Sequence, residues 1–321
     1  MLLFAIVAVA VVAQSCHHDA ILTAEERAAY ANDGVVLLKR RFDDKWLRLL
    51  RDGIEEDLAS ERRVRHTPEN ATAHYFEGVW AWSKVGAIEK FCRESPVASL
   101  AAELMGANER VNLIMDNWFV REAGSSGRPP WHHDISYFDF AGPMTVLWLP
   151  LEDSPAGTGL SFVRSSHLWG KHFQRIGFGT NPGRNMTSSA HSITVAGVTY
   201  EPPPIVDDDP TLEVIDYDVA AGDALFFDIR TVHGARRAFT PVGTSRRFSL
   251  RLGTEGVRLQ YRGDWAAGER EIIEAAGHRE GDATDSDFFP ALWRSTSHQS
   301  SNRHLSGETP HSCIRDDSRL L

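Results

Sequence analysis

The chain has 321 residues and a net charge of −10, with 42% hydrophobic and 24% charged residues. This composition is typical of a globular protein that is long enough to bury a substantial core. No block of Lys and Arg and no basic stripe with interleaved aromatic residues is present, which argues against nucleic acid as a partner.

An apolar run from Leu2 to Ala13 opens the chain. These twelve residues are fewer than the ~20 that a membrane-spanning helix needs, but they match the apolar region of a secretory signal. We therefore expect residues 1–21 to form a signal or hydrophobic leader, with no stable membrane insertion beyond it. No Lys or Arg precedes the run, so an uncleaved anchor and a mis-assigned start are alternatives, and so is a cytoplasmic location instead of a secretory or extracytoplasmic one.

The region before residue 110 is expected to be largely helical. Thr23-Ala24-Glu25-Glu26 resembles a helix start, with a capping Thr and acids in the first turn. Asp33-Gly34 predicts a turn into a short buried strand over residues 35–38. Apolar residues on one helical face predict a helix over residues 43–60, and a further helix is expected over residues 91–104.

After Val111 the pattern becomes that of short strands bounded by Gly, Pro, Asp or Ser. Helices followed by many strands predict one mainly β domain over residues 22–294, a sandwich or barrel braced by N-terminal helices. The expected strands cover residues 112–121, 145–151, 160–163, 211–219, 224–227 and 248–252.

Two segments lack a regular pattern. Residues 174–210 are rich in Gly, Pro and Ser and predict a long insertion, either a lid beside a site or a surface loop. The polar tail over residues 295–321 is expected to be disordered.

Trp131-His132-His133-Asp134 supplies two candidate metal ligands. Alternate side chains of a strand share a face, so His132 and Asp134 are expected to point the same way and His133 the other way. An imidazole and a carboxylate so placed are two of the three ligands of a 2-His-1-carboxylate iron site. The third candidate is His233, which follows a Gly222-Asp223 turn and an apolar strand and lies 99 positions after Asp134 (233 − 134).

Candidate cosubstrate contacts follow on a basic strand. Arg247 shares a face with Ser249, and a guanidinium with a nearby hydroxyl suits a carboxylate such as the tail of 2-oxoglutarate. Arg246 is the alternative to Arg247, and an exposed basic strand edge is the alternative to both. Asn117, Arg121 and Thr145 are further cosubstrate or pocket contacts by strand position, with structural roles as the alternative.

Together, in this order, the motifs resemble the phytanoyl-CoA dioxygenase family of Fe(II)/2-oxoglutarate-dependent oxygenases. Residues 131–134 stand where the family has Trp-His-x-Asp, and Gly222-Asp223 and His233-Gly234-Ala235 also match. Ser165-Ser166-His167 resembles the family's Gly-Ser-His stretch, with Ser165 in place of the Gly.

The resemblance implies a double-stranded β-helix, a jelly roll of the cupin-like kind. It also implies iron on His132, Asp134 and His233, and 2-oxoglutarate held by an Arg. With O₂, and ascorbate as reductant, such an enzyme converts 2-oxoglutarate to succinate and CO₂ while it hydroxylates an unactivated C–H bond of a small organic substrate.

Three rival functions bear on this expectation. Related halogenases lack the carboxylate that Asp134 provides, so a halogenase is disfavoured. A non-catalytic jelly-roll binding protein with a vestigial metal site stays open from the sequence, and so does a cupin-like zinc hydrolase. The identity of the substrate does not follow from the sequence.

Overall fold

The computed structural model describes residues 21–177, 189–262 and 267–296. All but the last residue of the expected leader, most of the expected C-terminal tail and residues 178–188 of the expected insertion lie outside these residues. Within the described ranges, no helix is both long and apolar enough to cross a membrane.

The N-terminal half of the described chain carries most of the helices, as expected. Thr23 and Glu26 cap each other at the start of the first helix, and the Asp43 side chain accepts from two backbone N–H groups at the start of the second. Gly34 ends the first helix at φ 81°, a left-handed conformation that glycine adopts without steric cost. The helices are α1 (Ala24–Asp33), α2 (Asp44–Leu58), α3 (Gly86–Glu94), α4 (Val97–Met105) and α5 (Ala267–Ala275).

The single helix expected over residues 91–104 is two helices, so that prediction was wrong in part. Helix α3 ends at Glu94, and Pro96 is the residue that precedes α4. Proline lacks an N–H and restricts the residue before it, so it is accepted at a helix start and disrupts a helix interior.

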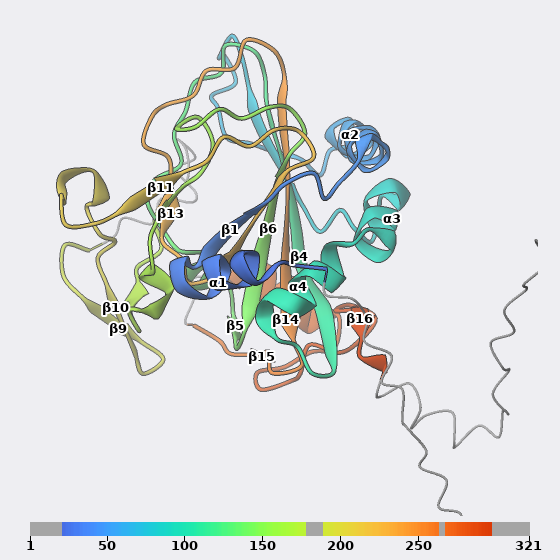
Figure 1. Ribbon diagram of the computed structural model, residues 1–321, viewed down its shortest axis with the longest axis vertical. Coiled ribbons are helices and arrows are strands. Elements are labelled where there is room, and N and C mark those ends of the chain that lie inside the picture. Colours follow the sequence, from blue (N-terminus) through green and yellow to red (C-terminus); the bar gives the residue numbers. More distant parts are fainter. Residues whose placement is uncertain (1–20, 178–188, 263–266, 297–321) are drawn as a thin grey trace, which may run out of the picture.

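A large antiparallel sheet forms the centre of the molecule (Figure 1). It contains the strands expected over residues 35–38, 112–121, 145–151, 224–227 and 248–252, together with β2, β3 and β16, which were not expected. The strand order is β1 (Val35–Leu38), β12 (Ala224–Asp228), β6 (Met144–Pro150), β14 (Ser245–Thr254), β4 (Arg110–Arg121), β3 (Tyr75–Val79) and β2 (Val64–Arg65), with β16 (Ala291–Arg294) paired to β4.

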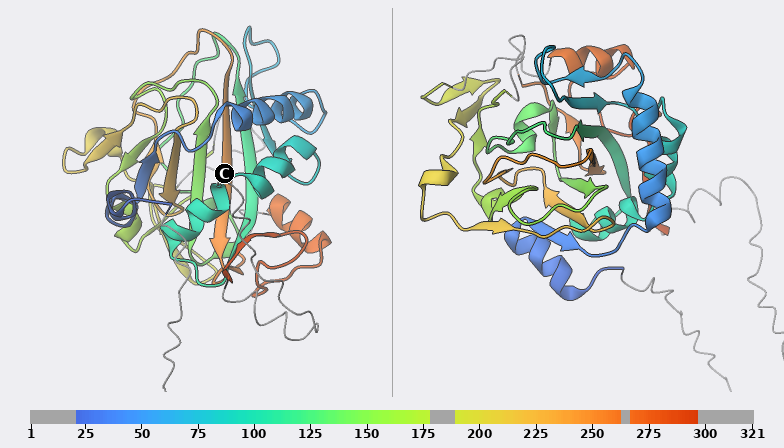
Figure 2. Two further views of the ribbon diagram at one scale, coloured as in Figure 1. Left: turned by 45° about the vertical axis from the view of Figure 1, so that its right-hand side comes forward. Right: turned by 90° about the horizontal axis from the view of Figure 1, so that it is seen from above.

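Smaller sheets complete the β structure, and the two views of Figure 2 show the sheets and helices as layers. The sheet that matters for the site has the order β11 (Val214–Asp216), β7 (Ser161–Val163) and β13 (His233–Gly234). Only three residues of the strand expected over 211–219 are in β11. The others are β8 (His172–Phe173), β10 (Val198–Glu201) and β9 (Ile193–Val195) in one sheet, and β5 (Phe140–Ala141) with β15 (Arg258–Leu259) in another.

Strand β14 shows how the main sheet separates its core from its polar face. Phe248 and Leu250 are fully buried, and the Phe248 ring lies 5.4 Å from the ring of Phe91 in α3. Each such side chain contributes roughly 1.5–3 kcal/mol by burial. The alternate residues Arg247 and Ser249 face the opposite way, so one face of the strand stabilises the fold while the other is free to form a site.

Candidate metal centre

The two candidate histidines face each other across an isolated antiparallel bridge. The His132 N–H donates to the carbonyl of His233 at 2.9 Å, and the His233 N–H donates to the carbonyl of His132 at 2.8 Å. Directly paired residues place their side chains on the same face, and the two ring centroids are 4.2 Å apart. The bridge therefore adds the segment around residue 132 to the β13 edge of the β11–β7–β13 sheet, which we call the small sheet. It also brings the two imidazoles together.

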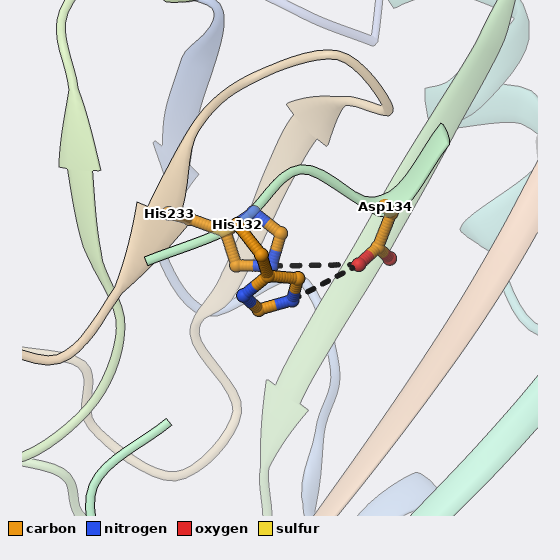
Figure 3. Close-up of side chains that lie close together, drawn as sticks. All are labelled: His132, Asp134 and His233. Carbon is orange, nitrogen blue, oxygen red and sulfur yellow. Dashed lines mark ion pairs between the residues drawn. The ribbon is translucent and has the colours of Figure 1, made fainter. Parts of the chain in front are cut away.

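Asp134 reaches the histidines by a route that the sequence did not predict. It begins a 3-10 helix over Asp134–Tyr137, so the strand alternation expected at this motif was wrong. Its Oδ1 nevertheless lies 3.4 Å from His132 Nε2 and 3.6 Å from His233 Nε2, and Figure 3 shows both imidazoles turned toward the carboxylate. All three side chains are buried, and their ligand atoms lie within 4.8 Å of one another.

Backbone carbonyls fix both histidine rings. His132 Nδ1 lies 2.8 Å from the carbonyl of Pro130, and His233 Nδ1 lies 2.9 Å from the carbonyl of Thr231. Because a carbonyl only accepts hydrogen bonds, both Nδ1 atoms carry hydrogen and both Nε2 lone pairs face Asp134. Burial, with the neighbouring His132, lowers the pKa of His233 to about 3, so this ring is neutral as a metal ligand must be. The donor set fits a divalent iron.

Arg251 controls the electrostatics of the carboxylate. Burial by itself would raise the pKa of Asp134, but the Arg251 guanidinium holds that pKa below its ordinary value. Arg251 donates from Nε and Nη2 to Oδ2 at 3.1 and 2.8 Å, which leaves Oδ1 as the oxygen that faces both histidines. Asp134 is therefore ionised and oriented.

A cavity of about 500 Å³ opens beside the triad, between the main sheet and the small sheet. Arg247 projects into it, with Cζ 5.7 Å from the centre of the Trp148 ring and 5.5 Å from that of Phe239. Burial lowers the pKa of Arg247 to about 10, which keeps the guanidinium charged at neutral pH. Among the described residues, no carboxylate forms an ion pair with it.

Other residues expected at the site are placed differently. Arg246 points away from the cavity and pairs with Glu152 and Glu55, so the structure does not bring it to the metal centre. Thr145 does not line the cavity either, because its hydroxyl donates to the Phe227 carbonyl at 3.1 Å. Asn117 lines the cavity.

His133 faces away from the metal centre, as expected. Its Nε2 accepts from the backbone N–H of Phe173 at 3.0 Å and lies 2.6 Å from the Ser136 hydroxyl. The residue therefore holds the metal-binding loop in place without contributing a ligand.

Two further arginines line the cavity wall: Arg121, which was expected there by strand position, and Arg251, to which the sequence reasoning gave no role. Arg251 lies on the same face of β14 as Arg247 and Ser249, so the alternation of the strand was the available signal. Arg121 lies over the ring of Tyr75 at 4.2 Å and packs so closely on Gly127 that a Cβ there would be 2.5 Å from its Nη1. Nothing local in the sequence indicated that contact.

A buried 2-His-1-carboxylate set that opens on a cavity, within a jelly roll, defines the class of non-haem iron oxygenases. The family model "Phytanoyl-CoA dioxygenase (PhyH)" matches residues 30–248, more than half of the chain. The chain belongs to this family, and the resemblance expected from the sequence is confirmed. A comparison with curated protein sequences gives no match.

Solved structures of similar fold include three 2-oxoglutarate-dependent or 2-oxoglutarate-bound proteins. The carbocyclase SnoK from nogalamycin biosynthesis is 20% identical with a TM-score of 0.65, over 84% of this chain and 96% of that one. The epimerase SnoN, in complex with Fe³⁺, α-ketoglutarate and nogalamycin RO, is 21% identical with a TM-score of 0.64, over 84% and 98%. EctD from S. alaskensis, with 2-oxoglutarate and 5-hydroxyectoine, is 16% identical with a TM-score of 0.55, over 78% and 82%. These likenesses confirm the expected jelly-roll fold.

Proposed function

We propose that this oxygenase hydroxylates an unactivated C–H bond of a small organic substrate while it converts 2-oxoglutarate to succinate and CO₂. His132, Asp134 and His233 would hold the iron, and Arg247 would hold the far carboxylate of 2-oxoglutarate. The observation that carries the proposal is a buried triad that shares one cavity with a charged guanidinium lacking a carboxylate partner among the described residues.

Iron on a facial triad supplies open coordination positions for a keto acid and O₂, and with them the oxidising chemistry. The chain supplies the geometry. Two backbone carbonyls hold the imidazoles, and Arg251 holds one oxygen of Asp134. Since Asp134 occupies a ligand position, hydroxylation is favoured over halogenation, which needs that position for a halide.

Arg247 is the group best placed to orient the cosubstrate. A guanidinium forms two parallel hydrogen bonds to a carboxylate, and the partly buried guanidinium of Arg247, near two aromatic rings, is suited to such a partner. Ser249 is expected to add a third bond, but its hydroxyl donates to the Leu147 carbonyl at 2.9 Å. The hold on the carboxylate therefore depends chiefly on Arg247.

The remaining space suits a small substrate. A volume of about 500 Å³ falls within the 300–1,000 Å³ that ligand pockets usually have, which leaves room for 2-oxoglutarate and one further molecule of modest size. Phe138, Phe227 and Met115 line the same cavity as the triad with apolar surface, which limits water in the cavity.

Succinate formation from 2-oxoglutarate, with Fe(II), ascorbate and air, tests the proposal, while mass spectrometry of candidate substrates searches for the gain of one oxygen. We expect His132→Ala, Asp134→Ala and His233→Ala each to abolish succinate formation. Arg247→Ala is expected to keep bound iron and to raise the KM for 2-oxoglutarate by about 10- to 100-fold, the loss of one charge-assisted contact.

Arg246→Ala is the matched control, because Arg246 is the adjacent arginine and faces the outer surface. It should leave iron content and KM unchanged. A triad variant with wild-type iron content and turnover would remove the metal assignment. A wild-type protein that binds iron but never consumes 2-oxoglutarate would favour the non-catalytic binding protein, and activity insensitive to O₂ would favour the zinc hydrolase.

A further inference from the structure

We infer that Asn117 and Glu77, two residues that do not touch the metal ligands, are positioning residues for the iron site. They belong to a chain of hydrogen bonds that begins at Asp134, passes through Arg251 and continues to His66. The inference rests on the proposed function, since it takes Asp134 as a metal ligand. It explains which oxygen of that carboxylate faces the metal.

The first link divides the two oxygens of Asp134 between two tasks. Arg251 binds Oδ2 through two N–H groups, and Oδ1 is the atom nearest to both histidines. A carboxylate that could rotate would present either oxygen, or both, to the metal. The direction of the Arg251 guanidinium therefore sets the ligand atom, and anything that turns the guanidinium disturbs the site.

The second link is the amide of Asn117, whose orientation is forced by its two neighbours. Arg251 Nη1 donates to Asn117 Oδ1, and Asn117 Nδ2 donates to Glu77 Oε1 at 2.8 Å. Arginine can only donate, so the amide oxygen must face Arg251, and the amide N–H group then faces the Glu77 oxygen that accepts it. Glu77 thus fixes the Asn117 amide, and the amide oxygen fixes Arg251.

The third link continues to His66, whose Nε2 lies 2.7 Å from Glu77 Oε2. The strand register brings these groups together, since Asn117 pairs with Val79 of β3 on one side and with Ser249 of β14 on the other. The exposed fractions are 4% for Asn117 and 8% for Arg251. Such a network is stabilising and rigid only when every member has its partner, because an unmatched polar group in this environment costs about 1–3 kcal/mol.

Exchange of the amide at position 117 with the carboxylate at position 77 gives a sharp test. Asn117→Asp places a second carboxylate against Glu77, where the native amide donates a hydrogen bond. The double variant Glu77→Gln/Asn117→Asp restores the pairing with its polarity reversed. The amide introduced at position 77 can donate to the carboxylate introduced at position 117, and that carboxylate can still accept from Arg251. The net charge of the pair in the double variant equals that of the native pair, so charge alone cannot explain a difference between them.

The readout is the affinity of the metal-free protein for Co(II), measured anaerobically by calorimetry, together with the visible spectrum of bound Co(II) and thermal unfolding before metal is added. We expect Asn117→Asp to weaken Co(II) binding about 10- to 100-fold and to change the spectrum, as loss of an outer partner does at other sites. The double variant should return to within a few-fold of wild type. Arg246→Ala, on the same strand as Arg251 but facing outward, is the control.

Each outcome decides a separate point. Wild-type protein that does not bind Co(II) or Fe(II) would overturn the proposed function itself. Wild type that binds, with Asn117→Asp equal to it, would overturn only this inference. A lower melting temperature with unchanged affinity and spectrum would also overturn it, because the role would then be structural. Failure of the double variant to recover would remove Glu77 from the hydrogen-bond chain. If Asn117→Asp does not fold, the smaller neutral variant Asn117→Ser is expected to show the same weakening.

Discussion

Asp116 predicts an unusual dependence of stability on pH. This carboxylate of β4 is fully buried on the helix-facing side of the main sheet, and no cation pairs with it among the described residues. Its oxygens accept backbone N–H groups of Ala81 at 3.1 Å and Trp82 at 3.4 Å. Burial nevertheless raises its pKa from 3.8 to about 7, and the nearby Asp57 acts in the same direction.

The direction in which Asp116 changes stability with pH follows from proton binding. Between about pH 4 and pH 7 the folded protein keeps a proton on Asp116 that the unfolded chain has released, so this residue lowers stability as the pH rises through that window. A shift of roughly three pKa units, at about 1.4 kcal/mol each, corresponds to a decrease of about 4 kcal/mol in the free energy of unfolding, which is complete above pH 7. Below pH 4 the residue has no such effect.

Asn at this position stays neutral at every pH. It can keep the Ala81 bond but loses the longer one to Trp82, which costs about 1 kcal/mol independently of pH. We therefore expect Asp116→Asn to be slightly less stable than wild type at pH 4.5 and more stable, by up to about 3 kcal/mol, at pH 8. The reversal between these two pH values is the expected signature.

Urea unfolding of both metal-free proteins from pH 4.5 to pH 8.5 measures the difference. Buried histidines act in the opposite direction, since burial lowers the pKa values of His133 and His233 to about 3, and their contribution to stability rises with pH up to about 6.5. Wild type and Asp116→Asn share these histidines, so the histidine contributions cancel in the difference between the two free energies of unfolding. The Cys92 thiol nearby stays neutral because burial raises its pKa. Two stability curves that run parallel over the whole range would refute the reasoning.

Two further predictions concern packing and charge. Arg251→Met leaves the Asp134 carboxylate buried without its guanidinium partner. We therefore expect the free energy of unfolding of the metal-free protein, measured with urea, to fall by about 3–5 kcal/mol. A decrease no greater than that of Arg246→Ala would contradict the role given to the Arg251–Asp134 pair. Gly78→Ala places a Cβ 2.2 Å from the Trp118 indole and should lower the free energy of unfolding by about 1–3 kcal/mol or more. Gly243→Ala, whose Cβ would have nothing within 4 Å, should change it by less than about 0.5 kcal/mol. Equal melting temperatures for these two variants would refute the argument.

The local rules of sequence predicted much of the fold. The capping residues Thr23 and Asp43 mark real helix starts, and the alternation of Phe248 and Leu250 with polar residues gives the correct faces of β14. These features depend on neighbours in the chain, so the sequence contains the information. β3 was missed because its alternation is interrupted by Gly78, whose absent side chain makes room for the Trp118 ring from β4.

Ser165 shows a similar limit. It stands where the family stretch has Gly, and its φ of 58° is the left-handed conformation for which glycine is the usual residue. The Ser165 hydroxyl donates to the carbonyl of Asn32 at 2.7 Å, a contact that offsets part of the strain. The comparison of motifs located the position, but only the three-dimensional contact explains why serine is accepted there.

The structure brings together the three residues that were predicted to form the metal triad, although the local argument for their geometry was wrong. His132 and Asp134 do not share a strand face, and the imidazole of His132 is aligned by pairing with His233, 101 positions away (233 − 132). That pairing is held by a small apolar cluster next to it, in which Trp131 packs with Val206 of the expected insertion.

A polar contact strengthens this attachment of the insertion. The Trp131 indole N–H donates to Asp207 at 3.0 Å, and Arg128 donates to the other oxygen of the same carboxylate at 2.6 Å. Because Trp131 immediately precedes His132, a residue more than 70 positions further along the chain (207 − 131) fixes the backbone that carries the first ligand. Alternation within a motif cannot encode such a contact, so the spacing His-x-Asp indicates candidate ligands, while long-range packing gives them their geometry.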